Sequence, residues 1–139
     1  MKQLVLSEMH QSLGGRMVEF AGYYMPVQYE GVKAEHHTVR NKVGVFDVSH
    51  MGEVFVSGKK AIDFLQYITT NDVSKLTPGK IQYTCLPNAE GGIVDDFLLY
   101  MIGENNYLLV VNASNMDKDL AWINKHNTFG CTINNQSDN

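Results

Sequence analysis

Two adjacent aspartates, Asp95 and Asp96, lie near the start of an apolar run that directly follows the glycine pair Gly91–Gly92. A carboxylate held in a dry site can move a proton or stabilise a developing positive charge. The rest of the run, residues 93–100, consists of strand-forming residues, and a continuous apolar run between turn signals predicts a strand covered on both faces. Two charges at the start of such a strand need an explanation.

The two aspartates cannot point the same way, because successive side chains of a strand point to opposite faces. One carboxylate can be solvated while the other is held inside. A second interpretation stays open, in which Asp95 and Asp96 are turn residues that cap the glycine loop.

A partner strand is predicted at Tyr107–Asn112, joined to the first by a hairpin turn at Gly103–Asn106. This spacing predicts that Asp95 pairs with Ser114. Asp95 then shares a face with Phe97, Leu99, Val110 and Asn112. The Asn112 amide would lie within reach of the Asp95 carboxylate. A turn longer by one residue would reverse the faces.

Two neighbouring histidines, His36 and His37, lie in a predicted helix over residues 32–42. Neighbours on a helix diverge by about 100°, whereas two ligands of one metal need positions i and i+4. We therefore predict no metal site. Instead, we expect Glu35, His36 or Arg40 to hold the helix to neighbouring loops by hydrogen bonds.

Asp47, Ser49 and His50 occur close together in a strand-like stretch, residues 45–53. They suggest a Ser-His-Asp hydrolase. Such triads are normally assembled from separated segments, however, and the sequence has no Gly-x-Ser-x-Gly elbow. We do not predict nucleophilic catalysis.

Aromatic residues gather in residues 20–29 without a clear helical or strand period. They are Phe20, Tyr23, Tyr24 and Tyr29. Two interpretations stay open: a hydrophobic arm that covers the core, and a ligand wall whose rings flank a planar molecule.

Residues 54–133 carry strand and helix signals in the order β-α-β-β-β-α-β. This order predicts an α+β fold in which helices cover one face of a mostly antiparallel sheet. The expected strands are 54–56, 81–86, 93–100, 107–112 and 129–133. Helices are expected after the caps Ser57 and Ser114, and a short one at 7–13. Residues 1–53 are interpreted as part of a first, incomplete domain.

The composition is that of an ordinary globular chain, with 139 residues, 44% hydrophobic and 19% charged, and a net charge of −4. The basic residues are dispersed, which argues against nucleic acid as a partner. No apolar run approaches the roughly 20 residues of a membrane span, and no signal-peptide pattern opens the chain. We therefore expect a cytoplasmic protein in which Cys85 and Cys131 are reduced thiols.

Several segments of the chain carry recognisable motifs: residues 15–22, 25–29, 35–37, 39–40, 46–53, 71–73, 91–96 and 111–113. Together these segments resemble those of the aminomethyltransferase of the glycine cleavage system, its T protein. They follow the family order through nearly the whole chain.

The resemblance implies an activity and a site. Family members move an aminomethyl carbon from the lipoyl arm of the H protein onto tetrahydrofolate and release ammonia. The first aspartate of the Gly-Gly-x-x-Asp-Asp motif, here Asp95, would be the essential carboxylate, because expelling ammonia leaves an iminium-like carbon. Asn112 would hold that carboxylate or the pterin, and Met51 and Tyr83 would line the folate site.

Family members are considerably longer than this chain and resemble a three-domain cloverleaf around the folate. We therefore expect residues 54–139 to be an α+β folate-site domain in a chain truncated after it, and inactive alone. Two alternatives remain. One is the folate-binding half of a sarcosine or dimethylglycine oxidising enzyme, and the other is a non-catalytic folate-binding module.

Overall fold

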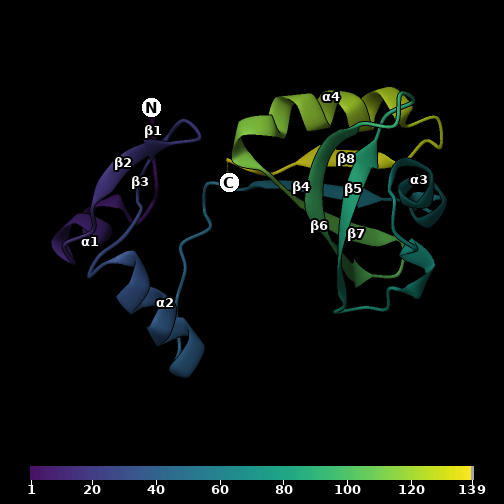
Figure 1. Cartoon of the computed structure of the whole chain (residues 1–139). Coiled ribbons are helices and arrows are strands. Elements are labelled where there is room, and N and C mark those ends of the chain that lie inside the picture. Colours follow the sequence, from purple (N-terminus) through teal and green to yellow (C-terminus); the bar gives the residue numbers. More distant parts are fainter. Residues whose placement is uncertain (139) are drawn as a thin grey trace. The chain divides into compact units, whose positions relative to one another are not determined.

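A computed structural model describes residues 1–138 of the chain. It contains two compact units, residues Met1–His50 and Met51–Asn139, which are drawn together in Figure 1. The division falls three residues before the predicted end of the first domain at residue 53.

The first unit combines a small sheet with two helices. Its elements are β1 (Lys2–Gln3), α1 (Ser7–Ser12), β2 (Met17–Phe20), β3 (Tyr23–Pro26) and α2 (Val32–Asn41). The sheet has the order β1-β3-β2, with β2 and β3 antiparallel. Both helices were predicted from the sequence.

The aromatic segment is more regular than its sequence suggests, because β2 and β3 form a hairpin. Ala21 and Gly22 connect the strands with positive φ angles of 51° and 84°. Two consecutive positive φ angles are the mark of the tight turn that matches strand twist. The sequence pattern, which has no clear strand period, therefore did not predict these two strands.

The predicted strand over residues 45–53 was also wrong for most of its length, since regular structure begins only at Gly52. Asp47 explains the break. Its Oδ1 accepts hydrogen bonds from the backbone N–H of Ser49, at 2.9 Å, and from the Ser49 hydroxyl, at 2.5 Å. A side chain that closes a turn on its own backbone competes with strand pairing.

The second unit has the predicted order β-α-β-β-β-α-β. The main elements are β4 (Gly52–Ser57), α3 (Ala61–Ile68), β5 (Ile81–Pro87), β6 (Ile93–Gly103), β7 (Asn106–Val111), α4 (Met116–His126) and β8 (Thr132–Asn135). Short 3-10 turns lie at η1 (Val73–Lys75) and η2 (Ala113–Asn115). The strands form one antiparallel sheet of order β5-β6-β7-β4-β8, which confirms the predicted α+β class.

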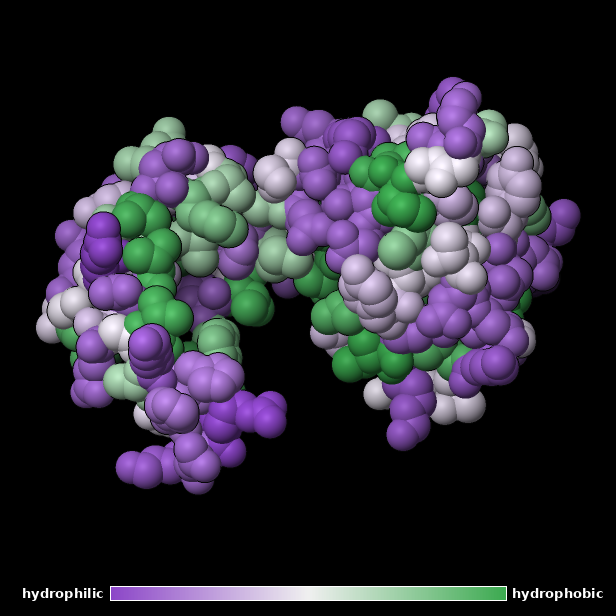
Figure 2. Space-filling view, in the orientation of Figure 1, coloured by the Kyte–Doolittle hydropathy of each residue, from purple (hydrophilic) through white to green (hydrophobic). Residues whose placement is uncertain are grey.

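One face of this sheet packs against both helices and forms the core. Alternate residues of the strands are buried there together with one stripe of α3. The buried cluster includes Val54, Val56, Phe64, Leu65, Leu86, Phe97, Leu99, Leu109, Val111 and Ile123. The opposite face, here called the open face, leaves large side chains exposed, among them Ile81, Tyr83 and Leu98. Figure 2 shows apolar residues on the surface of this unit.

The predicted helix caps were both misplaced. Ser57 ends β4, and a turn closed by the bond from Ala61 N–H to Gly58 O delays α3, whose N-cap is Lys60. The second predicted cap, Ser114, lies inside η2, so α4 begins after Asn115.

A bulge shifts the predicted register of the central hairpin by one residue. Gly103 pairs with Asn106, but Met101 already pairs with Tyr107, so Ile102 is the extra residue. As a result Val110 pairs with Leu98 instead of sharing a face with Asp95. The predicted register was therefore wrong.

Within residues 1–138, none of the helices combines the length and the apolarity that crossing a bilayer requires.

Candidate functional site

One end of the five-stranded sheet gathers most of the predicted site residues. Gly52, at the start of β4, pairs with Val111 at the end of β7. The start of β6 lies beside the same end of β7, because these strands are also antiparallel. Met51, Asn112 and the Asp95–Asp96 pair therefore lie at the same end of the sheet.

The turn before β6 is held by Asn88 and not by the aspartates. The Asn88 Oδ1 accepts from Gly92 N–H at 2.7 Å and from Glu90 N–H at 3.1 Å, while Gly91 takes a positive φ of 81°. Among the described residues, neither Asp95 nor Asp96 accepts a hydrogen bond from a backbone N–H of this glycine loop. The interpretation of Asp95 and Asp96 as caps of the glycine loop is therefore wrong.

Asp95 lies on the core face of the sheet, where only 7% of its surface is exposed. The Nδ2 of Asn112 donates to both Asp95 carboxylate oxygens, at 3.2 Å each, and to the Asp96 carbonyl at 2.9 Å. The predicted contact between Asn112 and Asp95 is thus confirmed, although the register that suggested it was wrong. Burial acts to raise the pKa of Asp95, but hydrogen bonds from Asp119 and Asn112 outweigh it and lower the pKa.

A second buried carboxyl group, Asp119 on α4, lies against Asp95. The side chain is completely buried. Burial, together with the hydrogen bond and charge of Asp95, raises the pKa of Asp119 to about 8. Sequence reasoning missed this residue, although its position three residues after Met116 and four before Ile123 places a carboxyl group on the buried stripe of the helix.

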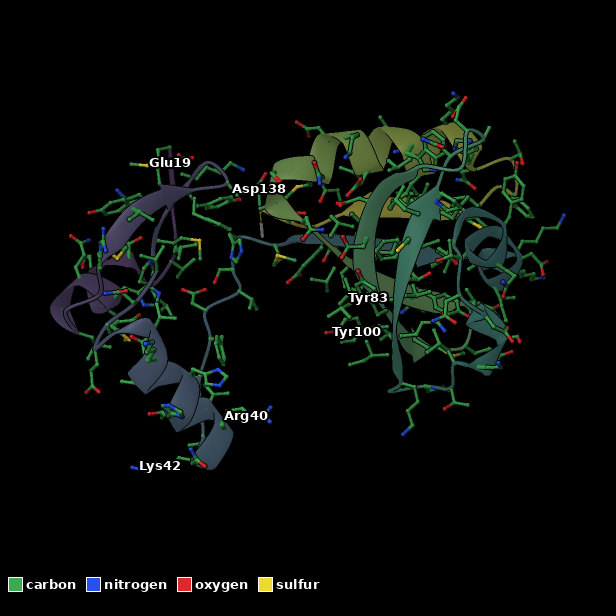
Figure 3. All side chains as sticks on the ribbon, in the orientation of Figure 1. Glu19, Arg40, Lys42, Tyr83, Tyr100 and Asp138 are labelled. Atoms are coloured by element: carbon green, nitrogen blue, oxygen red, sulfur yellow. The ribbon has the colours of Figure 1, made fainter. Side chains whose placement is uncertain are left out.

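Asp96 lies on the open face, next to Tyr83. The Tyr83 hydroxyl donates to Asp96 Oδ2 at 2.9 Å, and this bond, followed by burial, raises the pKa of Tyr83. Tyr100 of the neighbouring strand lies on the same face, and Figure 3 labels both tyrosines. The open face therefore presents a half-buried carboxylate beside the exposed ring of Tyr83 and the half-buried Tyr100, whereas Asp95 is turned to the core.

Met51 directly precedes β4 and is half-buried. The next residue, Gly52, has no room for a side chain, because a Cβ there would come within 2.7 Å of Val111 Cγ2 and 3.0 Å of Met116 Cε. This close approach fixes where the chain enters the sheet, and with it the position of Met51.

The first unit holds a different set of paired side chains. His10 Nδ1 bonds Tyr29 Oη at 2.6 Å, and His10 Nε2 bonds Asp47 Oδ2 at 2.7 Å. We call Tyr29, His10, Asp47 and Ser49 the polar clasp. Asp47 therefore pairs with His10 and not with His50, and the structure does not assemble the hydrolase triad that the sequence suggested.

Glu35 holds α2 to the preceding loop, as predicted. Its Oε1 accepts from Tyr29 N–H at 2.7 Å and from Gly31 N–H at 2.9 Å. These bonds lower the pKa of Glu35. Across residues 1–138, no three His, Cys, Asp or Glu side chains come together as a set of metal ligands.

Comparison with known proteins gives a consistent result. A family model described as GCVT N-terminal domain matches residues 6–139. The chain is 60% identical over 138 residues to an aminomethyltransferase of Flavobacterium psychrophilum, and 58% identical over 139 residues to one of Bacteroides fragilis. These matches cover 99% and 100% of this chain but 38% of each relative, so the chain spans little more than a third of their length.

A solved structure is also similar. The crystal structure of glycine cleavage system aminomethyltransferase T from Bartonella henselae matches with a TM-score of 0.90 and 38% sequence identity. The match covers 98% of this chain and 38% of that one.

Proposed function

The chain belongs to the family described as the GCVT N-terminal domain, and from this membership we propose that it is the N-terminal portion of an aminomethyltransferase of the glycine cleavage system. The full protein would transfer the aminomethyl carbon from the lipoyl arm of the H protein to tetrahydrofolate, with release of ammonia. The observation that carries the proposal is the match of essentially the whole chain to aminomethyltransferases at 60% and 58% identity.

The open face has the chemistry that a folate needs. Exposed Tyr83 offers a ring for stacking, Ile81 and Leu98 offer apolar surface, and Asp96 offers a carboxylate. Such a carboxylate can orient ring nitrogens and stabilise the iminium-like carbon that forms as ammonia leaves. Asn112, which bonds Asp95 and the Asp96 carbonyl, would keep this end of the sheet rigid.

Two carboxylates compete for the catalytic role. The family resemblance assigns it to Asp95, and that assignment stays a prediction. The geometry favours Asp96, because it shares the open face with Tyr83 while Asp95 is buried beside Asp119. Met51 and Tyr83 remain the proposed folate contacts.

Isosteric variants of the full-length protein distinguish the two. Changing the residue that stabilises the developing charge to Asn should lower the turnover of the protein by about 10²- to 10³-fold, with folding nearly unchanged. Asp95→Asn and Asp96→Asn are each assayed with lipoylated carrier protein and tetrahydrofolate, and their melting temperatures are recorded. If both variants stay active, neither residue is the catalytic carboxylate.

The same assay tests the alternatives. We expect the isolated 139-residue chain to give negligible transfer, because it spans only 38% of the length of its relatives. A non-catalytic folate module would bind tetrahydrofolate at full length without turnover, and a protein of the sarcosine or dimethylglycine oxidising class would require those amines. We also propose a cytoplasmic location, which the two free thiols Cys85 and Cys131 support.

A further inference from the structure

Asp119 is an unusual buried group, because its carboxyl oxygens receive no hydrogen bond from any described residue. It is 0% exposed, so bulk solvent does not reach it. A buried carboxylate in this situation would be strongly destabilising. The group must therefore lose its charge or find a partner.

Among the described residues, no cation forms an ion pair or a hydrogen bond with the Asp119 carboxyl group. Asp95 lies in contact and accepts hydrogen bonds from Asn112 through both of its oxygens, as an ionised carboxylate does. Asp96 adds a further negative charge. Lys118 is a positive neighbour that acts against the rise in the pKa of Asp119, but its Nζ donates to the Val94 carbonyl at 2.7 Å.

Two carboxyl groups in contact and out of water do not both ionise, so one of them keeps a proton. Asp95 has donors that favour its charged form, and Asp119 has none. The proton therefore belongs on Asp119, where it also supplies the only hydrogen bond that this side chain can make to Asp95.

We propose that Asp119 is a neutral carboxylic acid in the folded protein and donates a hydrogen bond to Asp95, which makes Asp119 a positioning residue for the aspartate pair. The bond joins α4 to the start of β6 and fixes the backbone from which Asp96 projects to the open face. A pKa of about 8 for Asp119 agrees with this assignment, as does the lowered pKa of Asp95. Only the consequence for turnover rests on the proposed function.

The protonation state is tested by NMR of the full-length protein labelled with ¹³C at the Asp carboxyl carbons. We expect one carboxyl signal to titrate near pH 8, and to be missing in Asp119→Asn. If every Asp carboxyl signal of the unchanged protein titrates below about pH 5, near the ordinary value, the proposal is overturned.

The pH dependence of stability gives a second readout. Because the pKa of Asp119 is higher in the folded protein than its ordinary 3.8, the stability that it contributes is complete below about pH 4 and is lost as the pH rises to about 8. Asp119→Asn should remove this loss. The matched control is Asp117→Asn, the same change at an exposed position in the first turn of α4. This control should leave the dependence of stability on pH between about pH 4 and 8 unchanged. If the stability of Asp119→Asn depends on pH in the same way as that of the unchanged protein, the proposal is contradicted.

Turnover of Asp119 variants distinguishes a positioning role of this residue from a role in packing alone. Asp119→Asn keeps a neutral donor and should retain turnover within about threefold. Asp119→Leu fills the same space without a donor and should lower turnover by about tenfold, roughly the effect of losing one hydrogen bond to a charged group. Equal turnover in the two variants would show that Asp119 only fills space. If the full-length protein shows no transfer at all, the proposed function fails, while the NMR titration still decides the protonation.

Discussion

The two units of the chain are stabilised in different ways. The second unit has a continuous apolar core to which the sheet and both helices contribute. In the first unit, the described residues that are buried are Leu4, Ser7 and His10, and the polar clasp connects α1 to the segments around Tyr29 and Asp47. The difference indicates that the second unit is stable through burial of apolar surface, whereas the first depends on a few directional bonds.

The largest expected effect is loss of the apolar core. Phe64 on α3 is completely buried, with its ring centroid 5.8 Å from that of Phe129. Phe64→Ala should lower the free energy of unfolding of the second unit by about 3–5 kcal/mol, because it removes a buried ring and leaves a cavity. Chemical denaturation checks the value, and Phe20→Ala, at an exposed ring in the first unit, is the control. An equal loss of free energy of unfolding in Phe64→Ala and Phe20→Ala would remove the distinction between the units.

The polar clasp should give the next largest effect. His10→Phe keeps a ring but breaks the bonds to Tyr29 and Asp47, which should destabilise the first unit by about 1–3 kcal/mol. Hydrogen exchange resolved by residue checks this result. Amides of residues 2–41 should exchange faster, while those of β6 and β7 keep their protection. Faster exchange throughout the second unit would show that the two units unfold together.

The clasp also predicts a pH dependence for the first unit. Burial acts to raise the pKa of Asp47, but the hydrogen bonds from Ser49 and His10 outweigh it and lower the pKa. The stability that Asp47 contributes is therefore complete above its ordinary pKa of 3.8 and is lost as the pH falls through the lower folded value. Exchange rates in the first unit, measured below and above pH 4, should show the loss. Asp47→Asn should remove it.

The smallest expected effect concerns the open face. Tyr83→Phe removes only the hydroxyl that donates to Asp96, at an exposed position, so the melting temperature of the full-length protein should be nearly unchanged. Affinity for tetrahydrofolate, measured by calorimetry, should change more than stability does, because the ring stays but Asp96 loses its partner. A fall in melting temperature with unchanged affinity would assign Tyr83 to folding alone.

The sequence correctly predicted the α+β class and the order of elements in the second unit. Apolar stripes such as Ala61, Phe64, Leu65 and Ile68 depend only on helical period. Local turn chemistry was harder to predict. The hairpin at Ala21–Gly22 and the delayed start of α3 depend on hydrogen bonds between backbone groups, which residue types alone do not reveal.

The sequence by itself determined that Asp95 and Asp96 point to opposite faces, because strand geometry alternates regardless of what surrounds the strand. Only the tertiary structure decided which face is buried. The extra residue at Ile102 set the register with β7, and the packing of α4 brought Asp119 against Asp95. A bulge and a helix position depend on contacts between distant segments, and a side chain loses its solvent and shifts its pKa only once those contacts form.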